Sequence, residues 1–399
     1  HKVSVSLIVL QIALSLAIVA NALFIIEQRI AQVRQPTGLD ERNLFLVTQQ
    51  WVGVSHAGSP AARSKLDSLL QEDLRTLRKI PDVASVTSIS ALPLMGASSN
   101  IYLNLKPLQQ HGDAFAGLYF GDESSLKTLG IRLVAGRNFS ANDVTSNASS
   151  QRVVIVTRSL ASELFPGGDA LGKSVYLDGG GAPSTIIGIV DRLHVPSVHG
   201  QEASSPWYSV IAPAQRPSVS TLYAVRAKPN RLAMAMKAVE PALYAANPGR
   251  VMGDGSVKAF ASVRADAYRA DIGTAMLMGA ISVLLLAVTG AGVAGLSNTW
   301  VSERRKEIGI RRALGARKRD ILRHFQLENI AIVGIGAMIG ACVAFGLNVL
   351  LMIHSEMESL PVIYVSVGAL IVIAVGQCAV FVPARQASNV PPAVATRSV

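Results

Sequence analysis

The chain has 399 residues, of which 50% are hydrophobic and only 16% are charged. Soluble domains average about 25% charged residues, so this composition indicates a membrane protein. Much of the formal net charge of +11 lies at the flanks of the apolar segments. Because no basic stripe with interleaved aromatic residues accompanies it, nucleic acid is excluded as an expected partner.

Four apolar segments are long enough to cross a membrane. Val3–Ile26, Ile272–Asn298, Ile330–Ile353 and Leu360–Val382 each exceed the roughly 18 residues that indicate a spanning helix. We expect the first to be a retained span rather than a signal peptide. The four segments contain no Asp, Glu, Lys, Arg or His. Ion-coupled transporters place ionisable residues at membrane depth, so any transport is expected to draw its energy from a partner.

Residues 27–271 are predicted to form a large extracytoplasmic domain with helical stalks at both ends. Both cysteines, Cys342 and Cys378, lie in predicted spans, so this domain is expected to hold together without disulfides. Two strand–helix–strand units occupy its ends and are expected to build one two-arm βαβ subdomain. Their expected elements are 43–48, 62–78 and 82–90, then 222–226, 231–246 and 251–252.

A β-rich subdomain is expected to be inserted between the two arms, at about residues 140–215. Its expected strands are 153–157, 175–177 and 185–190, and its expected helix is 159–165. The predicted fold class is therefore a membrane α-helical protein with four transmembrane helices and a large α/β extracytoplasmic domain.

Two features of the inserted region resemble ligand sites. Residues 167–174 satisfy the G-x-x-x-x-G-K-[ST] pattern of phosphate-binding loops. That mechanism needs a strand before the loop and a helix after it, whereas the expected order here is helix, loop, strand, so we expect no nucleotide there. His194 and His199 lack an accompanying carboxylate or cysteine at metal-ligand spacing, so we expect solvated loop histidines and no metal site.

The loop at 299–329, between spans two and three, is strongly basic. It contains nine Lys or Arg and four acidic residues, which predicts that it faces the cytoplasm. Ile310, Ala313 and Leu314, followed by Ile321 and Phe325, recur at helical spacing and predict an apolar stripe along a basic helix. Glu303 and Glu307 are four residues apart, as are Glu307 and Arg311, so an internal ion pair is expected. Topology alone does not need such a stripe, which favours docking of a partner or the membrane surface.

The remaining segments agree with this topology. Gly336 and Gly340 have the small-xxx-small spacing that lets helices approach closely in lipid, so we expect a packing role. The outer turn 354–359 carries Glu356 and Glu358, and residues 383–399 are expected to form a cytoplasmic tail.

The run Glu303–Ala316, ERRKEIGIRRALGA, resembles the ER-x-x-EIGIR-x-ALGA signature of MacB/FtsX-type ABC transporter permeases. The segments 129–139 (LGIRLVAGRNF) and 164–173 (LFPG…GK) are also similar to that family. The tail at 383–388 resembles the family's PARRA ending, although Gln386 and residues 389–392 depart from its commoner form. The resemblance implies that the loop rests on an ATPase subunit. The implied coupling residues are Glu303, Arg304, Glu307, Ile308, Ile310, Arg311, Ala313 and Leu314.

The resemblance implies a permease subunit that is not itself an enzyme and has no cofactor of its own. ATP and magnesium would be bound by a separate cytoplasmic ATPase, and a second permease protomer would complete a homo- or heterodimer. Such a protein would lie in the bacterial inner membrane among lipid and convert ATP hydrolysis into motion of the periplasmic domain. That motion would export an antibiotic, peptide or lipid-like substrate, often with a periplasmic adaptor and an outer-membrane duct.

Two alternatives remain open from the sequence. One is a lipoprotein-release permease with the same topology. The other is a non-transporting signalling protein of the FtsX kind, which activates a cell-wall hydrolase.

Overall fold

The structure, a computed structural model, describes residues 2–54, 59–96, 99–145, 151–196, 205–304, 307–308, 310–311, 317–355 and 359–388. The chain divides into two compact units. We call residues 35–269 the outer domain, and residues 1–34 together with 270–399 the membrane domain. Each is described by itself.

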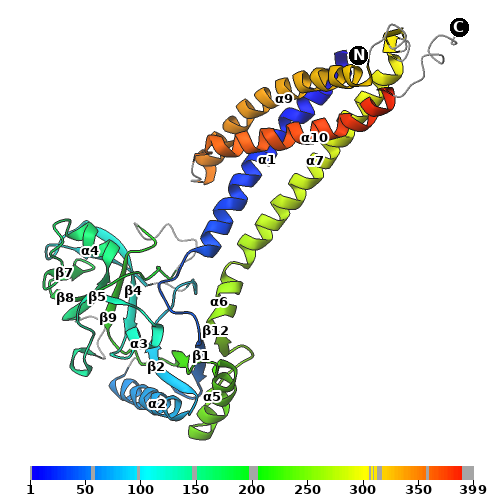
Figure 1. The fold of residues 1–399 in the computed structure, drawn as a ribbon. Helices are drawn as coiled ribbons and strands as arrows, with labels where there is room; N and C mark the ends of the chain where they lie inside the picture. The colour runs from blue at the N-terminus through cyan, green and yellow to red at the C-terminus, as the bar shows by residue number, and fades with distance from the viewer. Residues whose placement is uncertain are drawn as a thin grey trace. The chain divides into compact units, whose positions relative to one another are not determined.

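Among the described residues, four long helices make up the membrane domain: α1 (Lys2–Arg34), α7 (Arg269–Glu303), α9 (Lys318–Ser355) and α10 (Val362–Ser388). All four are long and apolar enough to cross a membrane, as the sequence predicts. α1, α9 and α10 pack together around a core that includes Ile12, Leu16, Val333 and Val372 (Figure 1). The start of α1 and the end of α10 lie at the same end of this bundle, as an even number of spans requires.

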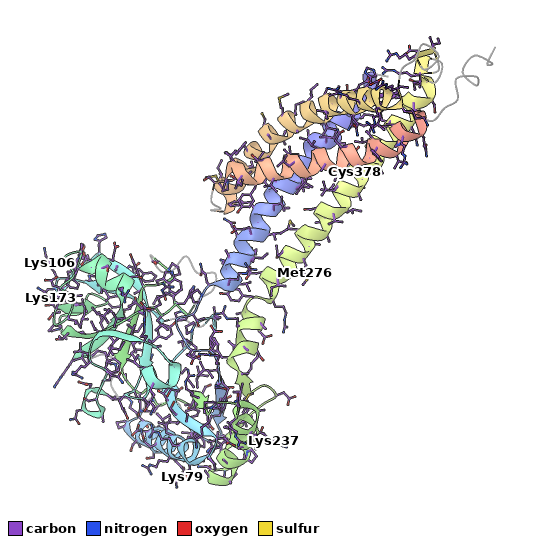
Figure 2. All side chains as sticks on the ribbon, viewed as in Figure 1. Lys79, Lys106, Lys173, Lys237, Met276 and Cys378 are labelled. Carbon is purple, nitrogen blue, oxygen red and sulfur yellow. The ribbon has the colours of Figure 1, made fainter. Side chains whose placement is uncertain are left out.

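Polar contacts join α7 to α1. The buried hydroxyls of Ser15 and Thr289 share a hydrogen bond of 2.7 Å. Near the other end, Arg29 Nη1 lies 2.9 Å from Asp271 Oδ1. Apolar side chains such as Met276 project from α7 away from these contacts (Figure 2), which suits a lipid-facing surface. The two polar contacts fix the register of α7 against α1 at two depths.

The first sheet of the outer domain is built from both arms of the chain, as predicted. It comprises β1 (Leu44–Trp51), β2 (Val83–Ile89), β10 (Ser220–Ala227), β11 (Arg250–Val251) and β12 (Val257–Ala259). The strand order is β11-β1-β10-β2, with β12 also paired to β1, and all of these pairings are antiparallel. Leu44 pairs with Arg226 at one end of the central ladder and Gln50 with Ser220 at the other.

Two helices cover one face of this sheet (Figure 1). α2 (Pro60–Lys79) begins at Ser59, whose side chain accepts a hydrogen bond from Ala62 N, and has proline in its first turn. Its buried leucines and the inward residues of α5 (Leu232–Ala246) pack on Phe45, Val47, Tyr223 and Val225. These strand residues alternate with neighbours that point to the opposite face, where α3 (Ser125–Leu129) packs on β2 and β10.

The second sheet has seven strands in the order β5-β8-β6-β9-β4-β3-β7, and a further pairing of β7 with β8 closes six of them into a ring. The strands are β3 (Ser99–Asn104), β4 (Ala114–Gly121), β5 (Leu133–Gly136), β6 (Val153–Thr157), β7 (Ser174–Leu177), β8 (Pro183–Val190) and β9 (Ser209–Pro213). Two short helices, η1 (Ala141–Asp143) and α4 (Arg158–Leu164), accompany these strands, whereas α3 packs on the first sheet.

The expected start of the inserted subdomain, at about residue 140, is wrong. Its sheet begins at β3, because β3 and β4 form a hairpin that pairs with β7 on one side and β9 on the other. The interior of the ring takes Ile101 and Leu118 from this hairpin and Val154, Ile186 and Val210 from the later strands. Neither set could bury its apolar side chains without the other.

Candidate functional site

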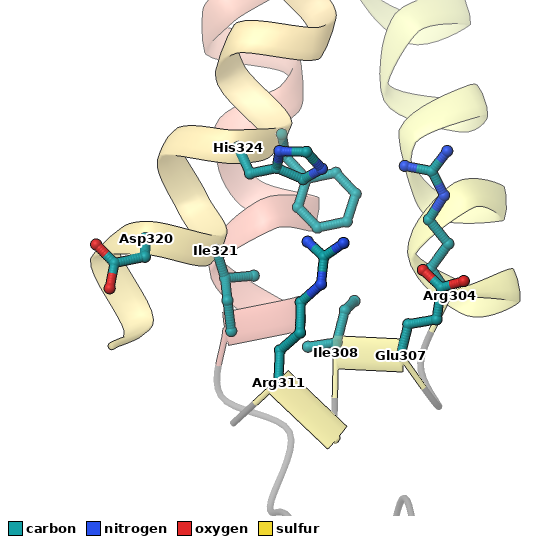
Figure 3. A pocket seen from close by; sticks show the side chains of 8 residues that line it. Arg304, Glu307, Ile308, Arg311, Asp320, Ile321 and His324 are labelled. Carbon is teal, nitrogen blue, oxygen red and sulfur yellow. The ribbon is translucent and has the colours of Figure 1, made fainter. Parts of the chain in front are cut away.

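The segments on either side of the loop between α7 and α9 enclose a small pocket. Its volume is about 100 Å³, and it is lined by Arg304, Glu307, Ile308, Arg311, Asp320, Ile321, His324 and Phe325 (Figure 3). Arg304, Glu307, Ile308 and Arg311 belong to the predicted coupling residues. The others come from the first two turns of α9, which runs without a break into the third span.

The floor of the pocket is apolar and belongs to the core of the membrane domain. Ile308, Ile321 and Phe325 are each less than 7% exposed, and they share one cluster with Val301 of α7 and Val380 of α10. Burial of each such side chain contributes roughly 1.5–3 kcal/mol. The loop is therefore fastened to three of the long helices by packing.

The predicted apolar stripe is divided between two faces of the loop. Ile310 is 48% exposed, whereas Ile308 is 4% exposed. Residues two apart on a helix point in nearly opposite directions, so Ile310 cannot align with Ile321 and Phe325 once Ile308 does. The stripe as predicted is therefore wrong at Ile310. Ala313 and Leu314 lie outside the described residues.

An ionic contact joins Arg304, which follows the end of α7, to α9. Arg304 Nη1 lies 2.9 Å and 3.1 Å from the two carboxylate oxygens of Glu328. Both side chains are about one-third exposed, so the pair contributes at most about 1 kcal/mol and serves mainly to orient Arg304. Arg311 reaches into the pocket toward His324 (Figure 3), and Glu303 and Glu307 lie on the exposed side.

The coupling residues predicted from the sequence do not include Glu328 and His324. The signal that could have found them is spacing along α9, since Glu328 lies seven residues after Ile321 and three after Phe325. Those intervals place it on the same helix face as the buried residues. His324 immediately precedes Phe325, and the two rings meet edge to face.

The two glycines assigned to helix packing lie on α9 against α1. A Cβ atom on Gly336 would come within 2.6 Å of Ile12 Cγ2, and one on Gly340 within 2.7 Å of Ala13 O. Only glycine permits this approach without a shift of one helix.

The phosphate-loop pattern at 167–174 has the wrong secondary structure for that role. α4 precedes it and β7 begins at Ser174, so no helix follows the lysine. Lys173 Nζ lies 3.0 Å from Asp169 Oδ2, and both side chains are at least half-exposed. Lys173 therefore forms an ordinary ion pair on the surface of the outer domain.

If the chain assembles with an ATPase partner, as the sequence resemblance implies, replacing Lys173 with alanine is expected to leave ATP hydrolysis within about twofold of the unmodified rate, because only an exposed surface ion pair is lost. The measurement is steady-state phosphate release. The control is the phosphate-binding lysine of the ATPase partner, whose replacement should abolish activity. An equal loss from the Lys173 variant would restore this loop as a nucleotide site.

The expectation of solvated loop histidines is wrong for His194. Its side chain is 5% exposed, its Nδ1 lies 2.8 Å from Val195 O, and its ring meets the edge of Trp207. Burial lowers its pKa below the usual value, so the neutral form is favoured. His199 lies outside the described residues. Among those residues, no group of three or more His, Cys, Asp or Glu has metal-site geometry.

Two family models together match most of the chain. The family model described as FtsX-like permease C-terminal matches residues 279–392, which contain the whole pocket. The model described as MacB-like periplasmic core domain matches residues 5–242, more than half of the chain.

Similar proteins share moderate identity with the chain. An uncharacterized ABC transporter permease, YvrN of Bacillus subtilis, is 25% identical over 100% of this chain and 96% of its own length. The macrolide export ATP-binding/permease protein MacB of Neisseria gonorrhoeae is 28% identical over 69% of this chain and 40% of its own length. The chain spans no more than half of the MacB relatives.

Among solved structures, the periplasmic region of MacB from Actinobacillus actinomycetemcomitans aligns with 59% of this chain and 96% of its own, at 17% identity and a TM-score of 0.35. The family matches are what decide membership. The chain belongs to the MacB/FtsX-like family of ABC transporter permeases, with a MacB-like periplasmic core domain.

Proposed function

We propose that the chain is the permease subunit of an ABC exporter and that a separate ATPase subunit docks on the loop between α7 and α9. The observation that carries the proposal is the two-sided loop. Ile308 is buried in the core of the membrane domain, and Ile310 is exposed on the other side. A partner that binds the Ile310 side and moves would displace Ile308, and with it the ends of α7 and α9.

In this proposal the ATPase binds ATP and magnesium and supplies the energy of hydrolysis. The residues of this chain bind the ATPase and transmit its movement to α7 and α9. Ile310 would occupy an apolar groove of the ATPase, and Glu303 and Glu307 would offer charge around it. The Arg304–Glu328 pair and the buried floor would make α7 and α9 move together.

Two permease protomers would face each other in the bacterial inner membrane, and the periplasmic domain would expel an antibiotic, peptide or lipid-like substrate. A periplasmic adaptor and an outer-membrane duct would extend the path. The family membership and the four apolar helices support this assignment.

Replacing Ile310 with aspartate tests the docking site. We expect the variant to express and insert normally, because Ile310 is half-exposed in the chain itself. Burial of an isoleucine contributes roughly 1.5–3 kcal/mol, so loss of that burial should weaken ATPase binding by about 10- to 100-fold. The measurement is recovery of the ATPase subunit with the tagged permease, together with substrate-stimulated ATP hydrolysis.

Val52 provides the matched control, since it is a 59% exposed apolar residue in the outer domain. Val52→Asp should retain the ATPase in full. Replacing Glu303 and Glu307 together with alanine should reduce coupling more gently, because exposed charges contribute little individually. Full retention of the ATPase and of stimulated turnover by Ile310→Asp would leave the loop as a topology determinant only.

A further inference from the structure

Part of the face of the first sheet that lies opposite α2 and α5 forms the floor of a large cavity in the outer domain. The cavity has a volume of about 510 Å³. Thr48, Leu222 and Ile89 cross its floor in one row, because Leu222 pairs with Thr48 on one side and with Ile89 on the other. Phe120 at the end of β4 and the connection from β9 to β10 form the opposite wall.

A second cavity of about 360 Å³ adjoins the first. The two share Thr48 and Met95, and the second is lined further by apolar residues such as Leu46 and Val263 and by the ion pair of Lys258 and Asp266. Each volume falls within the range of about 300–1,000 Å³ that is typical of small-molecule sites. We call the two cavities together the outer groove.

One cationic side chain lines the larger cavity. Of the described residues that line it, Arg216 is the only charged one, and the hydroxyl-bearing residues Ser218 and Ser220 line the same space. The Arg216 guanidinium carbon lies 5.2 Å from the centre of the Phe120 ring. A guanidinium stacked on an aromatic face presents its N–H groups at its edge, in the plane suited to a carboxylate, sulfonate or phosphate.

The segment that carries Arg216 is anchored on both sides. Gln215 accepts a hydrogen bond of 2.8 Å from Gln71 Nε2 of α2 and donates one of 3.3 Å to Asp122 Oδ2. Its backbone N–H also donates to Thr145 O. Such anchoring lowers the entropy cost of holding a ligand, because the cation is already in place.

We propose that the outer groove binds an amphipathic organic anion. Its apolar body would lie on Leu222, Ile89 and Met95, and its anionic group would meet Arg216 and the neighbouring hydroxyls. That this ligand is the exported substrate rests on the proposed function, whereas the binding itself does not.

The test uses the full chain in nanodiscs, without any ATPase, and the fluorescent anion 1-naphthalenesulfonate as the ligand, with empty nanodiscs subtracted. Saturable binding is expected. Arg216→Ala should weaken it by about tenfold or more, since a charge-assisted pair is lost. Arg216→Lys should restore only part of it. Ser220→Trp, which fills the groove from an exposed strand position, should remove binding without changing charge.

Arg63→Ala is the matched control, because Arg63 is an exposed arginine on α2 away from the groove and should leave binding unchanged. The amine analogue 1-naphthylmethylammonium should not bind, and inorganic phosphate should compete only weakly. Three results would each overturn the proposal. They are binding by the Arg216→Ala and Ser220→Trp variants as tight as that by the unmodified chain, binding of the amine as tight as that of the sulfonate, and full competition by phosphate. If the anion binds but does not stimulate ATP hydrolysis by the assembled transporter, the outer groove stands as a binding site, and the result counts against export of such anions.

Discussion

Replacing Arg250 with methionine is expected to lower the free energy of unfolding of the outer domain by about 3–5 kcal/mol. Arg250 Nη2 lies 2.8 Å from Asp73 Oδ1, and both side chains are fully buried. Removal of one partner leaves the other charge without compensation away from water. Few other single substitutions in the outer domain should lower its free energy of unfolding by as much.

The physical reason is that this pair joins elements that are remote in sequence. Asp73 on α2 also accepts hydrogen bonds from Gln49 of β1 and, at 2.7 Å, from Tyr223 of β10. The Arg250 guanidinium stacks over Trp51 at 4.4 Å. The two arms of the first sheet thus meet at one buried polar cluster, whose members depend on one another.

The measurement is pulse proteolysis of the outer domain of the full chain in urea. A double variant, Asp73→Leu with Arg250→Met, should recover much of the loss, because no charge stays buried. Arg231→Met is the matched control, since Arg231 and Asp82 form a half-exposed pair at 3.9 Å that should be worth at most about 1 kcal/mol. A single Arg250 variant no less stable than this control would show that the cluster contributes little.

Replacing Gly340 with valine is the second change with a large expected effect. The new Cβ would lie 2.7 Å from Ala13 O and 3.0 Å from Ala13 Cα, so a backbone rather than a flexible side chain would have to move. Overpacking of this kind costs about 1–3 kcal/mol or more. Helices α1 and α9 should separate, and the purified protein should melt at a lower temperature.

Gly346 offers a control on the same helix, because a Cβ added there meets no atom within 4 Å. Gly346→Val should melt close to the unmodified chain, and fluorescence-detected size-exclusion chromatography after heating measures both variants. Indistinguishable melting of the Gly340 and Gly346 variants would mean that the close approach of α1 and α9 is unimportant for stability.

The elements that the sequence determined are those with a strong local pattern. Four long apolar runs predicted α1, α7, α9 and α10, since crossing a membrane needs length and hydrophobicity within one segment. The leucines of α2 repeat at helical spacing, so their buried face was readable without a partner. The two-arm sheet was predicted for the same reason, because its strand–helix–strand units recur at both ends of the outer segment.

Only the tertiary structure decided which remote partners these elements choose. The hairpin of β3 and β4 belongs to the ring because β7 and β9 complete its edges, which no local pattern records. Ile308 rather than Ile310 faces inward because α9 supplies Ile321 and Phe325 beneath it. Arg304 pairs with Glu328, 24 residues away, for the same reason. The choice of ion-pair partner and inward face depends on long-range packing, which spacing along one helix does not contain.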